Sequence, residues 1–252
     1  MISVIVPYYR QRAMLRKHLQ TWQTYTQGTR EAFKLIIVDD GSPEPAETLI
    51  KEYGPLDFTL ELYRVTVDIP WNRSMARNLG SKVATDKWLL HMDTDHIMPR
   101  DSAAYLWQGV SANRYNLGHW YKFRRFRIGE ADFTRNKDLL PRNAKFGEIK
   151  PHVDSFLCSK ETYWKVGGYD PDYAGCLGGG GAFLRQLKKA SKECMADPIV
   201  HLHVYCAGEI PDSSIRSLDR DTSEYGRRRR EKERAGKTKV VNPIRYPWTR
   251  IL

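Results

Sequence analysis

Two short runs of acidic residues are the groups in this sequence that could most readily do chemistry. Asp93 and Asp95 flank Thr94, and Asp39 is followed directly by Asp40. Paired carboxylate oxygens favour a hard divalent cation such as Mg²⁺ or Mn²⁺, and a phosphate-bearing substrate would complete its coordination. A lone Asp-x-Asp is also common in solvated turns, because Asp favours turn positions. The role of these acids therefore depends on where the strands and helices place them.

Those elements predict that both acidic runs lie at one edge of a sheet. Strand and helix patterns alternate four times in the first hundred residues, which predicts an α/β fold with a doubly wound, mostly parallel, Rossmann-like sheet. Ligands bind such sheets outside the carboxyl ends of the strands, and each acidic run directly follows a predicted strand. The predicted strands are 2–7, 34–38, 58–65 and 87–92, and the predicted helices are 12–25, 44–53 and 72–83.

The pattern after residue 100 is typical of a mixed α+β region. We predict helices over 101–112, from 160 and over 183–192, and strands over 119–127, 153–158 and 199–204. We therefore divide one domain into an α/β half, residues 1–100, and a mixed α+β half, residues 101–212. A basic C-terminal tail, residues 213–252, follows.

Length and composition exclude several classes. The 252 residues suffice for one large domain with a real core, and 41% hydrophobic residues is not the composition of a disordered chain. No uninterrupted apolar run approaches the roughly 18 residues of a membrane span. The N-terminus lacks the basic region of a signal peptide, and the four cysteines have no C-x-x-C spacing that would indicate zinc. We expect a cytoplasmic protein without a transmembrane segment.

The excess positive charge is unevenly distributed. The chain has 41 Lys+Arg against 30 Asp+Glu, a net charge of +11, and the twelve basic and five acidic residues of 216–252 account for +7 of it. This tail is either a solvated helix or mobile arm, or a contact for the phosphates of nucleic acid or lipid headgroups. The stretch 119–127 interleaves aromatic with basic residues, either to line an acceptor groove or to form an edge strand with its rings packed inward. The candidate acceptor contacts are Trp120, Lys122, Arg124, Arg125, Arg127 and Arg228.

Five motifs in order, over residues 2–204, make the sequence resemble the family 2 glycosyltransferases, which are GT-A fold enzymes that use nucleotide sugars. Ile36–Ser42 (IIVDDGS) is similar to the family's second-strand signature almost letter for letter. The other matches are Val4–Tyr9 (the opening strand), Asn72 with Ala76-Arg77-Asn78 and Gly80 (the helix before the metal motif), Leu89–Asp95 (the strand and D-x-D) and Val166–Asp170 (the turn before the acceptor-side helix).

The resemblance implies that residues 1–100 are the nucleotide-sugar-binding half of the domain and residues 101–212 its acceptor-binding half. It also implies a donor, a metal and the residues that hold them. It implies a UDP-sugar donor and Mn²⁺ or Mg²⁺ bound by Asp93 and Asp95, a metal that bridges the diphosphate and stabilises the leaving group. His201 or His203, which alternation places on one face, resembles the late histidine that completes the metal shell in many GT-A enzymes; alternatively, either is a hydrogen-bonded core histidine. His96 is a further ligand candidate. The implied donor-binding residues are Pro7, Tyr8, Asp39, Asp40, Ser42, Arg77, Asp93 and Thr94.

One segment departs from the family pattern. After the G-G-Y-D turn the family normally carries an acid that acts as the general base of inverting transfer, whereas residues 173–182 (YAGCLGGGGA) contain none. The base could come from elsewhere, the enzyme could retain anomeric configuration with help from the leaving phosphate, or activity could be lost. Because the nucleotide and metal motifs are intact, we favour the first two. The candidates for the base are Asp170, Asp172, Asp154 and His152.

The charge distribution serves to rank acceptors. Our leading hypothesis is transfer of a hexose or pentose to 5-hydroxymethylcytosine in DNA, as in phage DNA glycosyltransferases, which would place the enzyme in the cytoplasm of a bacterial host. One alternative is a peripheral glycosyltransferase for polysaccharide or a lipid-linked glycan, with its tail on anionic lipid. Another is a non-catalytic nucleotide-sugar or nucleic-acid binding module. A nucleotidyltransferase ranks last, because residues 8–12 (YYRQR) form no glycine-rich phosphate loop.

Overall fold

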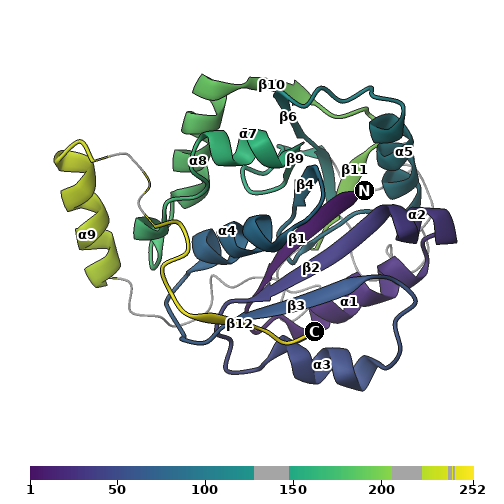
Figure 1. Cartoon of the computed structure of the whole chain (residues 1–252), viewed down its shortest axis with the longest axis horizontal. Coiled ribbons are helices and arrows are strands. Elements are labelled where there is room, and N and C mark those ends of the chain that lie inside the picture. The colour runs from purple at the N-terminus through teal and green to yellow at the C-terminus, as the bar shows by residue number, and fades with distance from the viewer. Residues whose placement is uncertain (128–147, 206–222, 238–239, 241) are drawn as a thin grey trace.

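The computed structural model describes residues 1–127, 148–205, 223–237, 240 and 242–252. In this part of the chain the centre is an eight-stranded sheet in the order β10-β6-β9-β4-β1-β2-β3-β12 (Figure 1). Its strands β3, β2, β1 and β4 are parallel neighbours. At either side of this group, β9 pairs antiparallel with β4 and β12 pairs antiparallel with β3. The predicted α/β fold with a mostly parallel sheet is confirmed.

The first half of the chain supplies the parallel strands and their crossover helices. Val4 and Val6 pack with α1 and α3 on one face of the sheet, while Ile5 packs with α4 on the other. Both faces are covered, which is why these strands are apolar runs rather than alternating ones. The elements are β1 (Ile2–Tyr8), α1 (Arg12–Gln23), α2 (Gln27–Ala32), β2 (Phe33–Asp39), α3 (Ala46–Tyr53), β3 (Leu60–Val65), α4 (Arg73–Val83) and β4 (Trp88–His91).

The second half extends this sheet and adds a small one. A four-stranded sheet, β5-β11-β7-β8, lies beside the end of β4. The predicted single strand over 119–127 is instead β6 and β7, which belong to different sheets, because the chain changes sheet at the buried Phe123. The elements are β5 (His96–Ile97), α5 (Arg100–Ser111), β6 (His119–Lys122), β7 (Arg124–Arg127), β8 (Glu148–Ile149), β9 (Phe156–Ser159), α7 (Lys160–Lys165), the 3₁₀-helix η2 (Pro171–Tyr173), α8 (Gly179–Ala190), β10 (Lys192–Met195) and β11 (His201–Val204).

The glycine run that follows η2 is not a loop. Gly178 takes φ +105°, a left-handed conformation that glycine adopts readily, and α8 begins at the next residue. The helix predicted over 183–192 therefore starts four residues earlier, and Gly179, Gly180 and Gly181 form its first turn.

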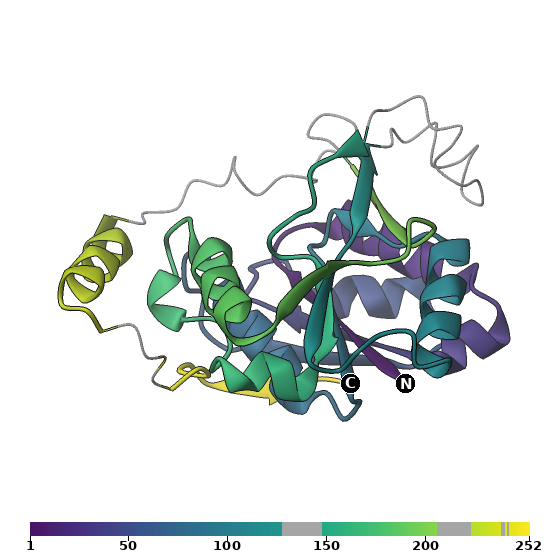
Figure 2. The ribbon, with the colours of Figure 1, turned by 90° about the horizontal axis from the view of Figure 1, so that it is seen from above.

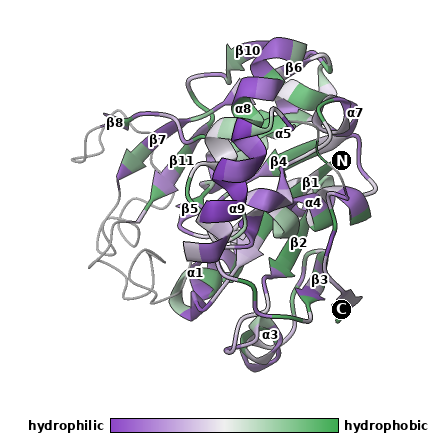
Figure 3. Cartoon of the chain, turned by 90° about the vertical axis from the view of Figure 1, so that its left-hand side faces the viewer, coloured by the Kyte–Doolittle hydropathy of each residue, from purple (hydrophilic) through white to green (hydrophobic). Residues whose placement is uncertain are grey.

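The basic C-terminal segment is partly solvated and partly built into the sheet. Helix α9 (Ser223–Arg234) has no buried residue and is hydrophilic along its length (Figure 3). It lies outside α8 (Figure 2), and the chain then returns to pair β12 (Trp248–Arg250) antiparallel with β3. The end of the tail is thus an edge strand of the central sheet rather than a free arm, and the boundaries at residues 100 and 212 remain predictions.

Within the described ranges, the helices are all too short or too polar to cross a bilayer.

Candidate active site

The carboxyl ends of β1, β2 and β4 meet at one edge of the sheet and are tied together by hydrogen bonds. The N–H of Asp40 donates to the carbonyl oxygen of Tyr8 at 2.9 Å. The Thr94 hydroxyl, two residues beyond Met92, donates to the carbonyl oxygen of Pro7 at 2.5 Å. The parallel register of these strands therefore brings the two acidic runs to a common edge, as the sequence predicts for a ligand site.

Asp39 shapes the loop after β2. Its Oδ1 accepts from the N–H of Ser42 at 2.7 Å, and its Oδ2 accepts from the N–H of Ala46 at 2.9 Å and from Arg64 at 3.1 Å. Burial raises the pKa of Asp39, against the lowering effect of these partners. Gly41 has φ +71°, and a Cβ there would lie 2.8 Å from the carbonyl carbon of Val67, so the tight turn requires glycine.

The carboxylate of Asp93 lies between the guanidinium group of Arg77 and the imidazole ring of His152. Arg77, 1% exposed, forms an ion pair with Oδ1 of Asp93, and Nδ1 of His152 lies 2.8 Å from Oδ2. Burial alone would raise the pKa of Asp93, but Arg77 and His152 hold it well below its usual range. In the described structure, Nε and Nη1 of Arg77 have no hydrogen-bond acceptor. Unmet donors on a buried guanidinium fit an anionic ligand such as a phosphate.

Asp95 and His96 complete this cluster. The Asp95 side chain is 29% exposed, and burial together with Asp93 raises its pKa to about 7. His96 contacts Ser155 through Nδ1 at 2.5 Å and accepts from Arg125 through Nε2 at 3.0 Å. Burial lowers the pKa of His96 well below 6.5, so its ring is neutral.

The cluster offers the donor set of a divalent cation. Asp93, His96 and His152 each present one ligand atom, and the three atoms lie within 4.8 Å of one another. Carboxylate oxygens suit Mg²⁺ or Mn²⁺, and imidazole nitrogen is a further ligand for a transition-metal ion. The residues present therefore fit a metal at this place, with the Asp95 carboxylate beside it.

The structure does not bring His201 or His203 into this cluster. His203 pairs with Ile97 in the small sheet, whereas His96 pairs with Val204, so the two histidines point to the face opposite His96. Their Nε2 atoms are 3.2 Å apart, and Nδ1 of His201 donates to the carbonyl oxygen of Ile199 at 2.8 Å. Burial lowers the pKa of His201 to about 4 and that of His203 to about 3.

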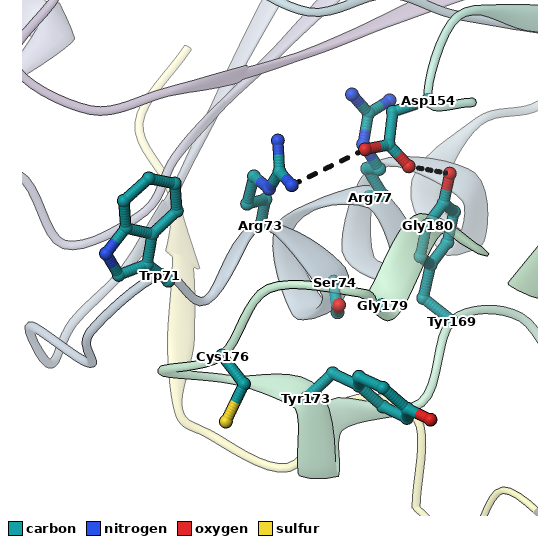
Figure 4. Close-up of a pocket in the computed structure, with 10 residues that line it drawn as sticks. All are labelled: Trp71, Arg73, Ser74, Arg77, Asp154, Tyr169, Tyr173, Cys176, Gly179 and Gly180. Carbon is teal, nitrogen blue, oxygen red and sulfur yellow. Dashed lines mark hydrogen bonds and ion pairs between the residues drawn. The ribbon is translucent and has the colours of Figure 1, made fainter. Parts of the chain in front are cut away.

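A small pocket lies between the start of α4 and the start of α8 (Figure 4). Asp154, 2% exposed, accepts from the Tyr169 hydroxyl through Oδ1 at 2.9 Å, and its Oδ2 lies 3.5 Å from Nη2 of Arg73. Arg77 reaches the pocket from one side and pairs with Asp93 beyond it, so the pocket adjoins the acidic cluster. The lining residues are Trp71, Arg73, Ser74, Arg77, Asp154, Tyr169, Tyr173, Cys176, Gly179 and Gly180.

The structure places Asp170 and Asp172 elsewhere. Nζ of Lys232 in α9 lies 2.6 Å from Oδ2 of Asp170 and 2.7 Å from Oδ2 of Asp172. Arg245 lies 2.6 Å from the other oxygen of Asp172. Burial raises the pKa of Asp172, but these two cations lower it below its usual value. Both acids therefore anchor the C-terminal segment, and neither lines the pocket.

The predicted acceptor contacts have different surroundings. Trp120 is fully buried and packs edge-on against Phe156, so it faces the core rather than a groove. Arg125 contacts His96 and is the one member of this group beside the acidic cluster. Of the others, Lys122 pairs with Glu193, Arg124 with Glu148 and Arg228 with Glu224, and Arg127 is exposed.

Sequence reasoning missed several residues that hold the site together. His18 of α1 donates from Nε2 to the carbonyl oxygen of Thr94 at 2.8 Å, and burial lowers its pKa to about 4. Ser155 supports His96, and Trp71 and Arg73 line the pocket. No motif indicates His18, because only the packing of α1 against the D-x-D turn brings the two together.

Known proteins that are similar to this chain in sequence include glycosyltransferases. A validoxylamine A glucosyltransferase of Streptomyces hygroscopicus subsp. jinggangensis is 29% identical over 206 residues, which cover 69% of this chain and 48% of that protein. The chain thus spans about half the length of this relative.

Solved structures give the fold. Staphylococcus aureus TarS 1–349 in complex with UDP-GlcNAc superposes with a TM-score of 0.61 at 12% identity, covering 90% of this chain and 64% of that one. The mannosyltransferase PcManGT from Pyrobaculum calidifontis, in complex with GDP-Man and Mn²⁺, superposes with a TM-score of 0.56 at 18% identity, covering 80% and 56%. The fold is therefore GT-A-like. Residues 3–177 match the model of glycosyl transferase family 2. Since this match spans more than half of the sequence, the chain belongs to glycosyl transferase family 2.

Proposed function

We propose that the chain is a metal-dependent glycosyltransferase that moves a sugar from a nucleoside diphosphate, with UDP the expected nucleotide, to an acceptor hydroxyl. The observation that carries the proposal is the cluster of Asp93, Asp95, His96 and His152 at the carboxyl ends of parallel strands, beside a buried arginine with unmet donors. The solved relatives that hold UDP-GlcNAc, or GDP-Man with Mn²⁺, support it.

Different residues of this chain would bind the different parts of the donor. Pro7, Tyr8 and the loop from Asp39 to Ser42 would hold the nucleoside, with the Asp40 carboxylate accepting from the base. Asp93 and Asp95 would hold Mn²⁺ or Mg²⁺, with His96 a further ligand; the ion would neutralise the diphosphate as it leaves. Arg77 would donate from its unmet N–H groups to the same phosphates.

For the acceptor we propose DNA, with the hydroxymethyl group of 5-hydroxymethylcytosine as the attacked hydroxyl. The supporting observation is the position of α9. Its Tyr225 lies against Gly175, and Gly226 adjoins Cys176, which lines the pocket. The helix also carries the exposed residues Arg227, Arg228 and Arg230, of which Arg227 pairs with Glu231 and Arg228 with Glu224. Exposed guanidinium groups on a helix that contacts the pocket suit the phosphate backbone of a nucleic acid, and binding through them would depend on salt concentration. Such an acceptor would be met in the cytoplasm.

The donor half of the proposal is tested by turnover of UDP-sugars in the presence of Mn²⁺. We expect UDP release from at least one donor, and its loss in Asp95→Ala. Glu47→Ala is the matched control, because Glu47 is an acid on the outer side of α3 that pairs only with Lys51 in the described structure. Equal turnover by Asp95→Ala and wild type would refute the metal role of the D-x-D pair.

The acceptor half is tested with duplexes that contain 5-hydroxymethylcytosine, followed by mass spectrometry of the nucleosides. We expect a hexose or pentose mass on the modified base, and weaker DNA binding when Arg227, Arg228 and Arg230 are replaced together by Gln. A charge-matched control replaces the exposed Lys51, Lys82 and Lys189 by Gln. No mass shift with any active donor would refute DNA as acceptor. Binding to anionic vesicles, lost in the arginine variant alone, would then favour the membrane-associated glycan alternative.

A further inference from the structure

We propose that Asp154 is the catalytic carboxylate that receives the proton of the acceptor hydroxyl, and that Gly180 creates the space in which it sits. This inference rests on the proposed function, and it assigns one residue to the proton-transfer step. It comes from the shape of the pocket in Figure 4, in which the carboxylate of Asp154 lies against the first turn of α8.

The position of Asp154 is unusual for a side chain with only a structural role. Among the described residues that line the pocket it is the sole carboxylate. Its Oδ1 is oriented by the Tyr169 hydroxyl, which stays protonated because burial and the nearby Asp154 raise the pKa of Tyr169 well above 10. Among the described residues its Oδ2 has the longer contact, 3.5 Å, with Arg73, whose side chain is 30% exposed and lies over the Trp71 ring. One oxygen is thus fixed, and the other is available to an acceptor hydroxyl.

Gly180 is the residue that makes this position available. A Cβ built on Gly180 would overlap Oδ1 of Asp154 and lie 2.7 Å from its Cγ and 2.8 Å from its Oδ2. Real side chains do not approach so closely, so any residue other than glycine at this position would displace the carboxylate. The neighbouring Gly181 is different, because a Cβ there would meet only Arg185, at an ordinary 3.7 Å. The sequence G-G-G therefore contains one glycine that the pocket requires and one that it does not.

The other candidates for the base are engaged elsewhere. Asp170 and Asp172 bind Lys232 and Arg245, and Nδ1 of His152 lies 2.8 Å from Asp93. In the proposed step the acceptor oxygen forms a bond to the anomeric carbon while the bond from that carbon to the diphosphate oxygen breaks. The electron pair leaves with the nucleoside diphosphate, and the acceptor proton passes to Asp154. A single displacement of this kind inverts the anomeric configuration.

The first test replaces Asp154 by Asn, which keeps the shape and the contact with Tyr169 but cannot take the proton. With the donor and acceptor that the wild type uses, we expect the turnover number to fall roughly 10²- to 10⁴-fold with the KM for the donor little changed. We also expect formate to restore part of the rate in Asp154→Ala, and wild-type product of inverted configuration. Turnover of Asp154→Asn within threefold of wild type, or a product of retained configuration, would overturn the inference.

The second test uses the two glycines as a matched pair, since both variants add one methyl group in the same helical turn. We expect Gly180→Ala to lose turnover as severely as Asp154→Asn while still binding the donor, and Gly181→Ala to keep wild-type turnover. Calorimetric donor binding and Tm are measured for both, so that a folding defect is visible. Equal turnover in the two glycine variants would refute the seating of Asp154 against Gly180. If the wild type is inactive with every donor, the proposed function is refuted together with this inference. If the wild type and Asp154→Asn are both active, only this inference is refuted.

Discussion

The ion pair between Arg77 and Asp93 makes a quantitative prediction about both stability and donor binding. Arg77 is 1% exposed, and the Asp93 side chain is 15% exposed. Replacing Arg77 by Met keeps much of the side chain's volume but leaves a buried carboxylate whose remaining charged partner is His152. Removing one partner of a buried pair costs about 3–5 kcal/mol of the free energy of unfolding. In a chain of 252 residues that corresponds to a fall in Tm on the order of 10 °C.

The same variant changes the titration of Asp93. Burial raises the pKa of this carboxyl and Arg77 is the largest influence that lowers it, so the pKa must rise in Arg77→Met. In the wild type the depressed pKa means that ionised Asp93 stabilises the fold at a pH above the ordinary Asp value. That contribution is lost as pH falls through the folded-state pKa. The variant should therefore lose less stability on acidification than the wild type does.

Urea unfolding at several pH values measures both effects, and a double-mutant cycle isolates the pair. Arg77→Met combined with Asp93→Asn should recover part of the loss, because no uncompensated carboxylate remains buried. Donor binding by calorimetry should weaken in Arg77→Met even at a temperature where the variant is fully folded. A loss below about 1 kcal/mol, the level of an exposed ion pair, would refute the view that this pair is buried and coupled.

Three further changes probe the surroundings of the site. Replacing His152 by Gln should remove a pH-dependent stabilisation. Burial lowers the pKa of His152, but Asp93 together with Asp154 raises it above its usual value, so the contribution is present below 6.5 and is lost as pH rises through the folded-state pKa. The difference in unfolding free energy between wild type and variant, measured without metal from pH 6 to 9, should shrink; a constant difference would contradict this. Replacing His18 by Leu should loosen the D-x-D turn and weaken Mn²⁺ binding by roughly tenfold, as loss of a supporting partner does. His18→Gln should retain part of the Mn²⁺ affinity that His18→Leu loses. Titration of both variants with Mn²⁺, followed by electron paramagnetic resonance, measures the two affinities. Replacing Lys232 by Met should cost more than the roughly 1 kcal/mol of an ordinary surface pair, because its ammonium group serves two carboxylates; chemical unfolding with Lys237→Met as control decides it.

The sequence predicts the central sheet well because its signals are local. Runs such as Val4–Val6 and Leu35–Val38 are apolar throughout, and apolar runs between helices specify buried parallel strands. The position of the acidic runs at the ligand site is then predictable, because ligands bind at the carboxyl ends of such strands. The short elements β5 and β8 have two residues each and carry no periodic pattern, so they could not be predicted in this way.

The surroundings of individual side chains were harder to predict, because they depend on contacts distant in sequence. The sequence predicts Trp120 as an acceptor contact, yet its ring packs on Phe156 from the neighbouring strand β9. Asp170 and Asp172 look like free acids in the sequence, and only the fold brings Lys232 and Arg245 to them. The pair formed by Asp154 and Gly180 is likewise invisible until β9 and α8 are packed together.

The pairing of β12 with β3 has a consequence for how the protein is made. During synthesis β3 emerges well before β12, and its outer edge stays unpaired until residues 248–250 have left the ribosome. An open edge next to Leu62 and Val65, both buried in the finished protein, is a template for pairing with other chains. Nascent or truncated chains that lack residues 242–252 should therefore be the aggregation-prone species. The basic helix α9 should be altered by point substitution, because deleting the segment would also leave the sheet unfinished.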